Sequence, residues 1–210
     1  MILWINGAFG SGKTQTAYEL HHRLPDSFVY DPENIGYFIR ENVPDSARTE
    51  DFQDYPMWRT FNFEMLDYIA KNYSGTIIVP MTITSRKYYD EIIGRLSEKY
   101  DVTHVILYAE KETLLKRIAS RLERRNSWAA CQIDRCIRAF QEEITEHKIH
   151  TDTLTISQTA EKAAEAAGIT LPEDTRNCLQ KFFERNITKL KHIRQHSAGT
   201  EQQNRKEETV

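Results

Sequence analysis

Short apolar runs alternate with longer amphipathic stretches along most of the chain. The apolar runs have the length and composition of strands, and they cover residues 2–6, 28–31, 76–80, 103–109 and 148–151. The stretches between them have helical periodicity, over residues 12–24, 56–73, 85–99, 110–125, 127–143 and 157–167. Such alternation is typical of βαβ units, whose parallel strands are buried on both faces. We therefore predict a three-layer α/β/α domain around a five-stranded parallel sheet.

The composition is that of one folded domain with a small appendage. Of 210 residues, 40% are hydrophobic and 28% are charged, which excludes disordered and collagen-like chains. The net charge of −3 provides no uniform cationic field, so we expect no nucleic-acid partner. The longest apolar runs, 2–5 and 77–81, are far shorter than the roughly 20 residues that span a bilayer. The amino-terminal sequence lacks the basic region of a signal peptide, and we expect a cytosolic protein.

The sequence GAFGSGKT, residues 7–14, matches the P-loop pattern G-x-x-x-x-G-K-[ST] between a predicted strand and a predicted helix. Glycines let the backbone turn its N–H groups around a polyphosphate, and the helix that follows points its positive end at the anion. Lys13 is expected to reach the β and γ phosphates, and the Thr14 hydroxyl to bind magnesium. A chance glycine-rich turn is the alternative. The predicted ATP site comprises Gly7, Gly10, Ser11, Gly12, Lys13, Thr14 and Gln15.

The acidic residue that usually ends the strand beside the P-loop strand, the Walker B acid, is missing from its expected place. That strand closes on Pro80, Met81 and Thr82. Asp31, at the end of the FVYD run, is the best substitute, because the carboxyl ends of parallel strands face the ligand crevice. It is a candidate for holding magnesium through water or for accepting the proton of an acceptor hydroxyl. Alternatively, Asp31 only starts a turn and caps the helix that follows; Glu33 is a weaker candidate.

An arginine-rich segment, residues 117–138, is the second feature that fits phosphoryl transfer. Arg117, Arg121 and Arg124 or Arg125 fall on one helical stripe, and Arg135 and Arg138 lie on the returning helix. Guanidinium groups of a helical lid are able to close over a triphosphate and spread the charge of the transition state. The alternative is a solvated basic helix face interleaved with acids. The predicted catalytic residues are Lys13, Asp31, Arg117 and Arg121, and Arg117 is also a predicted ATP contact.

Several segments resemble the family of bacterial ATP-binding tunicamycin-resistance proteins. These segments are MILWINGAFGSGKTQTA, VYDPE, IIVPMTI, EIIGRL, KETLLKR, NSWAA and QIDRC, and the similarity extends to about Arg194. The resemblance implies a P-loop fold similar to the nucleoside-monophosphate kinases, with shikimate, gluconate and chloramphenicol kinases among the small-molecule members, and protection against a nucleoside antibiotic. It also implies that Asp31 faces the acceptor and that residues 150–154 contact the adenine. The missing Walker B acid departs from the pattern.

Aromatic residues between 52 and 63 offer material for a drug-binding surface. Tyr55 and Trp58 provide ring faces and Arg59 a polar group; with Asp31 and Arg135 they complete the predicted substrate site. Helical spacing also places Trp58, Phe61, Met65 and Ile69 on one face of the predicted helix over 56–73. For Trp58 and Phe61 in particular, a place in the core is therefore favoured over contact with a ligand.

A basic amphipathic helix is predicted over 173–194, at the end of a single domain covering 1–194. From 175 to 194 it has six cations against one anion, Glu184. Docking on the protein's own domain and peripheral binding to an anionic membrane both fit this composition. Residues 195–210 are polar and are expected to form a disordered tail.

Cysteines and histidines add no further site. Cys131, Cys136 and Cys178 have no C-x-x-C spacing, and we expect them to be reduced, half-buried thiols. The histidines show no metal-ligand spacing, so magnesium bound with ATP is the only metal expected. The favoured function is ATP-dependent phosphorylation of tunicamycin or a related nucleoside. ATP-dependent sequestration of the drug at the membrane face and an ordinary nucleoside or nucleotide kinase are the alternatives.

Overall fold

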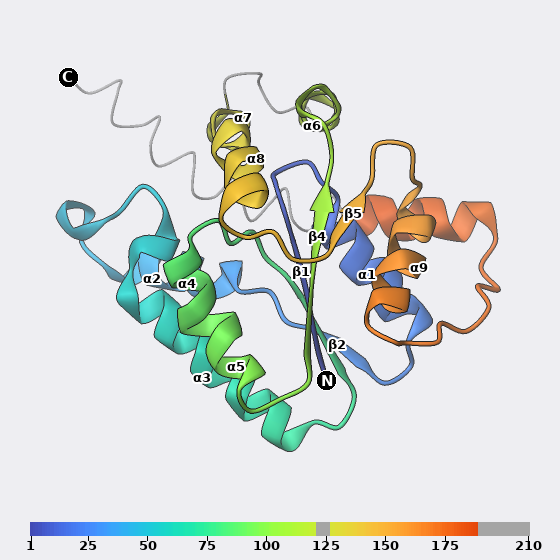
Figure 1. The fold of residues 1–210 in the computed structure, drawn as a ribbon, viewed down its shortest axis with the longest axis horizontal. Coiled ribbons are helices and arrows are strands. Elements are labelled where there is room, and N and C mark those ends of the chain that lie inside the picture. The colour runs from blue at the N-terminus through green and yellow to red at the C-terminus, as the bar shows by residue number, and fades with distance from the viewer. Residues whose placement is uncertain (121–126, 189–210) are drawn as a thin grey trace. The chain divides into compact units, whose positions relative to one another are not determined.

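The structure, a computed structural model, describes residues 1–120 and 127–188 (Figure 1). The chain divides into two compact units, Met1–Pro172 and Glu173–Val210. Each unit is described by itself. The domain boundary expected at Arg194 and the tail lie outside the described residues and stay predictions.

Five parallel strands form one sheet in the first unit, in the order β2-β3-β1-β4-β5. They are β1 (Ile2–Gly7), β2 (Ser27–Val29), β3 (Thr76–Pro80), β4 (Val102–Tyr108) and β5 (Lys148–His150). Leu3 of β1 lies opposite Ile78 of β3 on one side and Thr103 of β4 on the other. The predicted five-stranded parallel sheet is confirmed. The edge strand β2 ends earlier than predicted, although the Tyr30 N–H still donates to the Ile78 carbonyl at 2.9 Å.

Helices cover both faces of the sheet, so β1 is buried along its whole length (Figure 1). Alternate side chains of β1 enter two separate cores, as the pleat of a strand requires. Leu3 and Ile5 pack in a core with α1 (Lys13–Arg23) and α9 (Ile156–Ala166). Ile2 and Trp4 pack in the core on the opposite face, which contains the buried residues of the remaining helices. The three-layer prediction is therefore confirmed.

The other helices of the first unit lie between β2 and β5 in the sequence. They are α2 (Glu33–Asn42), α3 (Pro56–Asn72), α4 (Arg86–Tyr89), α5 (Arg95–Ser97), α6 (Lys111–Ala119), α7 (Trp128–Cys131) and α8 (Ile133–Glu142). A π-helical segment, Asp90–Gly94, joins α4 to α5, so the helix predicted over 85–99 is continuous but not uniformly α-helical. The helix predicted over 127–143 divides at Gln132.

The core-facing side of α3 differs from the expected one. Phe61 and Met65 are 44% and 43% exposed, whereas Trp58 and Leu66 are fully buried. Asn62 lies between them in the core, where its Oδ1 accepts from the Tyr30 hydroxyl at 2.8 Å and its Nδ2 donates to the Trp58 carbonyl at 2.8 Å. Because this polar residue is satisfied by hydrogen bonds, the buried stripe passes through it. Apolar spacing thus predicts the burial of Trp58 correctly, but it places Phe61 and Met65 in the core wrongly.

Two other expectations need correction. Cys136 is fully buried, while Cys131 and Cys178 are exposed, so none of the three free thiols is half-buried as expected. In the second unit, the basic helix predicted to begin at residue 173 begins at 178, and its described part covers residues 178–188. Among the described residues, no helix has the length and apolarity needed to cross a bilayer.

Candidate active site

The P-loop connects the end of β1 to the start of α1, at the carboxyl edge of the sheet. Gly7, Gly10 and Gly12 have φ values of 144°, 82° and 101°, a region that side chains rarely adopt. A Cβ on Gly7 would lie 2.6 Å from the Leu107 carbonyl oxygen, and one on Gly10 would lie 2.9 Å from that of Leu114. The loop backbone is therefore pressed against β4 and α6, where only glycine fits.

Lys13 begins α1 and folds back over the loop. Its Nζ donates to the carbonyl oxygens of Gly7 at 3.0 Å and Ala8 at 3.1 Å. The Ser11 hydroxyl, inside the loop, is buried and has no hydrogen-bond partner within the described ranges. Neither has the hydroxyl of Thr14, which is only partly buried at the second position of α1. A lysine ammonium, two available hydroxyls and a glycine loop at a helix N-terminus fit a magnesium–polyphosphate group.

Asn6 anchors the start of the P-loop, and the sequence analysis missed it. Its fully buried Oδ1 accepts from the backbone N–H groups of Gly7 at 2.8 Å and Ile83 at 2.9 Å. Its Nδ2 donates to the Ile83 carbonyl at 2.9 Å and lies 3.1 Å from Nε2 of His104, a ring whose pKa burial lowers to about 4. The available signal was an asparagine ending an apolar strand directly before a glycine, where a polar side chain needs specific partners.

A hydroxyl stands near the P-loop where an acid is usual. β3 ends at Pro80 beside β1, and the Met81 N–H donates to the Ile5 carbonyl at 3.1 Å. The Thr82 hydroxyl then donates to the Gly7 carbonyl at 2.9 Å. In this structure, β3 therefore ends beside the P-loop with a hydroxyl, where related folds usually have a carboxylate. Thr82 supports the loop backbone instead.

Asp31 follows β2 and lies in the electrostatic neighbourhood of the P-loop lysine. Burial raises the pKa of Asp31 to about 7, the Glu33 carboxylate adds to this rise, and the Lys13 charge opposes it. Burial and the Asp31 charge together raise the pKa of Tyr18 on α1. The Asp31 Oδ1 also accepts from the Glu33 N–H at 3.0 Å, so the predicted turn forms as well. The turn and a chemical role are therefore compatible.

Arg135 on α8 forms an ion pair with Asp51. Its guanidinium lies 3.2 Å from Oδ2 of Asp51, whose Oδ1 accepts from the Gln53 N–H at 3.0 Å. Burial raises the pKa of the neighbouring Cys136 thiol, and the charges of Lys13 and Arg135 oppose this rise. This set of interactions places α8 close to the P-loop. We call Asp31, Asp51 and Arg135 the acceptor side, because Asp31 and Arg135 are the acceptor contacts predicted from the sequence and Asp51 is the ion-pair partner of Arg135.

Arg117 on α6 contacts Thr151, the residue that follows β5, and its predicted contact with ATP stays a prediction. Its guanidinium donates to the Thr151 carbonyl at 2.6 Å and to the Thr151 hydroxyl at 3.0 Å. It thus contacts the segment 150–154, in which an adenine contact was expected. Gln15 lies in the first turn of α1, next to the loop. Arg121 lies outside the described residues, so its role and that of the predicted lid stay predictions.

Two predicted substrate residues, Tyr55 and Trp58, are core residues in this structure. Trp58 is fully buried, and its indole N–H donates to the Pro32 carbonyl at 3.0 Å. Tyr55 is 6% exposed, and its hydroxyl accepts from the Thr49 N–H at 2.9 Å. Both polar groups are satisfied inside the protein, so the structure accounts for these residues by packing. Contact with a drug stays a prediction.

Arg59 is held in a polar network. Its guanidinium is bonded to the Glu91 carboxylate, donates to the Gln53 carbonyl at 2.6 Å and lies 4.3 Å from the centroid of the Tyr88 ring. Arg59 is only 6% exposed. These partners join α3 to the π-helical segment, and removing any one of them would leave a buried charge poorly compensated.

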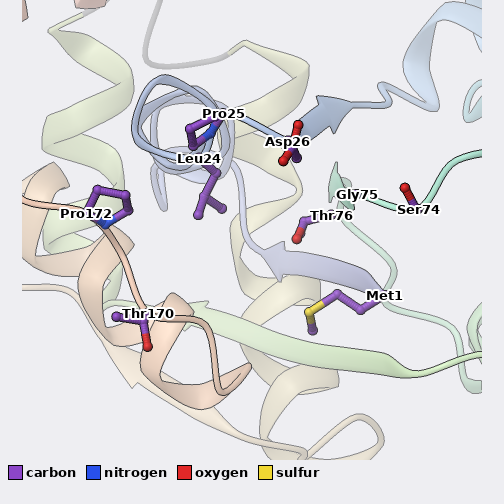
Figure 2. Close-up of a pocket in the computed structure, with 9 residues that line it drawn as sticks. All are labelled: Met1, Leu24, Pro25, Asp26, Ser74, Gly75, Thr76, Thr170 and Pro172. Atoms are coloured by element: carbon purple, nitrogen blue, oxygen red, sulfur yellow. The ribbon is translucent and has the colours of Figure 1, made fainter.

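The cavity drawn in Figure 2 is at the other edge of the sheet and is separate from this site. Its volume is about 370 Å³. Its walls come from the residues that precede β1, β2 and β3 and from the segment after α9: Met1, Leu24, Pro25, Asp26, Ser74, Gly75, Thr76, Thr170 and Pro172. Because parallel strands run in one direction, the residues before them and the P-loop lie at opposite edges.

Comparison with known proteins identifies the family. Residues 2–143 match the AAA domain family. The Deinococcus radiodurans tunicamycin resistance protein is 32% identical, over 82% of this chain and 98% of that chain, with a TM-score of 0.71. This chain belongs to the tunicamycin resistance protein family, within the AAA domain family. The match with the AAA domain covers the P-loop, Asp31 and Arg135 of this AAA-domain protein.

More distant structures show the same fold. A sugar kinase from Janibacter sp. HTCC2649 is 20% identical over 80% of this chain and 95% of that chain, with a TM-score of 0.57. Shikimate kinase from Bacteroides thetaiotaomicron is 15% identical over 80% of this chain and 99% of that chain, also with a TM-score of 0.57. No curated protein sequence matches the chain. This AAA-domain protein therefore has a kinase-like P-loop fold of the nucleotide-binding type.

Proposed function

We propose that the protein protects cells against tunicamycin or a related nucleoside antibiotic by transferring the γ-phosphoryl group of ATP to a hydroxyl of the drug. Its similarity to a tunicamycin resistance protein supports the substrate class. The proposed phosphoryl transfer rests on Asp31, a half-buried carboxyl that feels the charge of Lys13. A carboxyl whose pKa is raised to about 7 is suited to accept a proton near neutral pH. The protein would act in the cytosol, where ATP is available.

Each residue has a defined part in this reaction. ATP bound with magnesium supplies the phosphoryl group. Lys13 and the P-loop N–H groups hold the phosphates, and Thr14 is positioned to bind the metal. Asp31 accepts the proton of the acceptor hydroxyl while that oxygen bonds to the γ-phosphorus. The bond from phosphorus to the bridging oxygen of ADP breaks, and its electron pair stays with ADP.

Mass spectrometry of the drug tests the proposal directly. After incubation with the protein, ATP and magnesium, we expect tunicamycin to gain the mass of one phosphoryl group. Asp31→Asn should bind ATP and modify the drug far more slowly than the wild type, and Lys13→Ala should fail at an earlier step. Drug recovered unchanged from a stoichiometric excess of wild-type protein and ATP would contradict phosphorylation. If a plain nucleoside is a better acceptor than the drug, an ordinary nucleoside kinase is the better description.

A second candidate is ATP-dependent sequestration of the drug at the inner face of the membrane. Leu179, Phe182 and Phe183 in the second unit are 61–69% exposed, which suits an interfacial helix. However, Arg176 and Lys181 are paired with Asp174, which reduces the charge available to anionic lipid. Sequestration predicts protection that scales with the amount of protein and is lost when residues 173–210 are removed. Flotation with anionic vesicles would measure the membrane binding.

A further inference from the structure

An exposed tryptophan lies against the P-loop, outside the machinery assigned above. Trp128 is the first residue of α7 and is 45% exposed. Its ring meets that of Phe9 edge-on, with centroids 5.2 Å apart and an interplanar angle of 77°. Phe9 belongs to the P-loop, and the Lys13 Nζ lies 5.6 Å from its ring centroid. An aromatic pair therefore stands beside the lysine that is expected to hold the transferred phosphate.

Trp128 differs from the two other tryptophans, which serve the core. Trp4 and Trp58 are fully buried, and their indole N–H groups donate to the carbonyls of Met81 at 3.2 Å and Pro32 at 3.0 Å. The indole N–H of Trp128 has no acceptor among the residues that the structure describes. A large aromatic ring with a free donor is costly to expose and is typical of ligand recognition.

The position of Trp128 is fixed by its own helix. The Ser127 hydroxyl caps α7 by accepting from the Ala130 N–H at 3.3 Å, and the Cys131 N–H donates to the Ser127 carbonyl at 3.1 Å. α7 packs against α8, which carries Arg135. The exposed ring is thus held beside the P-loop on a helix that packs against the one carrying Arg135, whereas Arg117 contacts the segment after β5.

We propose that Trp128, backed by Phe9, is a specificity-determining residue that stacks against the planar base of the nucleoside-type acceptor. A flat indole face matches a flat heterocycle, and the indole N–H is available to a carbonyl oxygen of a pyrimidine. This inference rests on the proposed function for its acceptor class. It makes Trp128 a contact of the acceptor and not of ATP.

The test compares acceptor binding with nucleotide binding in matched variants. Trp128→Ala should weaken tunicamycin and uridine binding about ten- to hundredfold, as expected for loss of one base stack, while Trp128→Phe retains most of the affinity. The dissociation constant of a non-hydrolysable ATP analogue with magnesium should change less than about twofold. Tyr68→Ala is the control, because Tyr68 is an aromatic residue of α3 that is 65% exposed and is not a candidate contact of the drug. Isothermal titration calorimetry provides all the constants, and thermal melting verifies folding.

Fluorescence provides an independent readout. Because Trp4 and Trp58 are buried, acrylamide should quench mainly Trp128, and uridine should protect it. An unchanged drug affinity in Trp128→Ala, an equal loss of ATP affinity, or protection by N-acetylglucosamine instead of uridine would overturn the inference. These results are distinguishable from failure of the proposed function. Unmodified drug whose binding depends on Trp128 refutes transfer alone, and phosphorylated drug with unchanged affinity in Trp128→Ala refutes the stacking alone.

Discussion

The P-loop and the acceptor side of the candidate active site are held by different parts of the chain. The P-loop is fixed by the central strands and the residues that end them: the Gly7 backbone lies against β4, and the side chains of Asn6 and Thr82 bond its amide and carbonyl. The acceptor side depends on charged side chains from α8 and from the loops after β2 and α2. The P-loop is thus built into the central sheet, whereas the proposed acceptor contacts belong to segments outside the sheet.

We therefore expect substitutions in the P-loop and substitutions on the acceptor side to have different effects. Changes in the P-loop should remove nucleotide use or destabilise the fold. Changes on the acceptor side should alter transfer or drug affinity with ATP binding intact. A variant that violates this separation would show that the two halves are coupled.

Lys13→Ala has the largest expected effect. Without the ammonium that neutralises the phosphates, we expect transfer to fall by about a thousandfold or more, because charge stabilisation supplies most of the catalysis in phosphoryl transfer. Turnover of drug and survival of cells on tunicamycin measure the loss. Lys13→Arg is the control that retains the charge. Full protection by Lys13→Ala would show that nucleotide use is irrelevant to resistance.

Asp31→Asn should reduce transfer by about a hundredfold to ten-thousandfold, the usual contribution of a general base, with unchanged ATP affinity. In the wild type, activity should rise with pH through a pKa of about 7, because Asp31 must lose its proton to act as a base. The rise should be missing from the residual activity of the variant. A pH–rate profile of the wild type that is flat from pH 5.5 to 8.5 would argue against this base.

The same carboxyl provides a stability readout. The folded-state pKa of Asp31 is raised from 3.8 to about 7, so the folded protein binds the proton more tightly than the unfolded chain. The free energy of unfolding should therefore decrease as pH rises between these values. Asp31→Asn should remove this part of the pH dependence and be more stable than the wild type at pH 8. Urea denaturation at a series of pH values measures this pH dependence. A loss of stability caused by Asp31 is expected if the residue is kept for function.

The contrast between the P-loop and the acceptor side also explains which parts of the site could be predicted from the sequence. Glycines with positive φ and the adjoining lysine have fixed spacing in a continuous segment, so the P-loop and the sheet around it were predictable. The Asp51–Arg135 pair joins residues that only the folded chain brings together, and no local pattern reveals it. Burial of Tyr55 and Arg59 was equally hidden, whereas burial of Trp58 was expected from its helical spacing. Their composition suits both a ligand surface and a core, and only packing distinguishes the two.

Asn6→Ala should destabilise the protein by about 3 kcal/mol, because the buried partners at Gly7 and Ile83 lose their hydrogen bonds together. Thr82→Val, which removes one hydrogen bond to the Gly7 carbonyl and leaves the one from Lys13, should cost about 1 kcal/mol. Urea denaturation with unchanged m-values would measure both. Equal losses in the two variants would contradict the central role assigned to Asn6.

Arg135→Met has the smallest expected effect on stability. Arg135 is half-exposed, and its ion pair with Asp51 is screened by water, so the loss should stay below about 1 kcal/mol. If Arg135 serves the acceptor, the KM for the drug should rise while the KM for ATP does not change. Arg138→Met, on the same helix and also exposed, is the matched control. A stability loss above about 2 kcal/mol, with both KM values unchanged, would make Arg135 a structural residue and move the boundary between the two halves of the site.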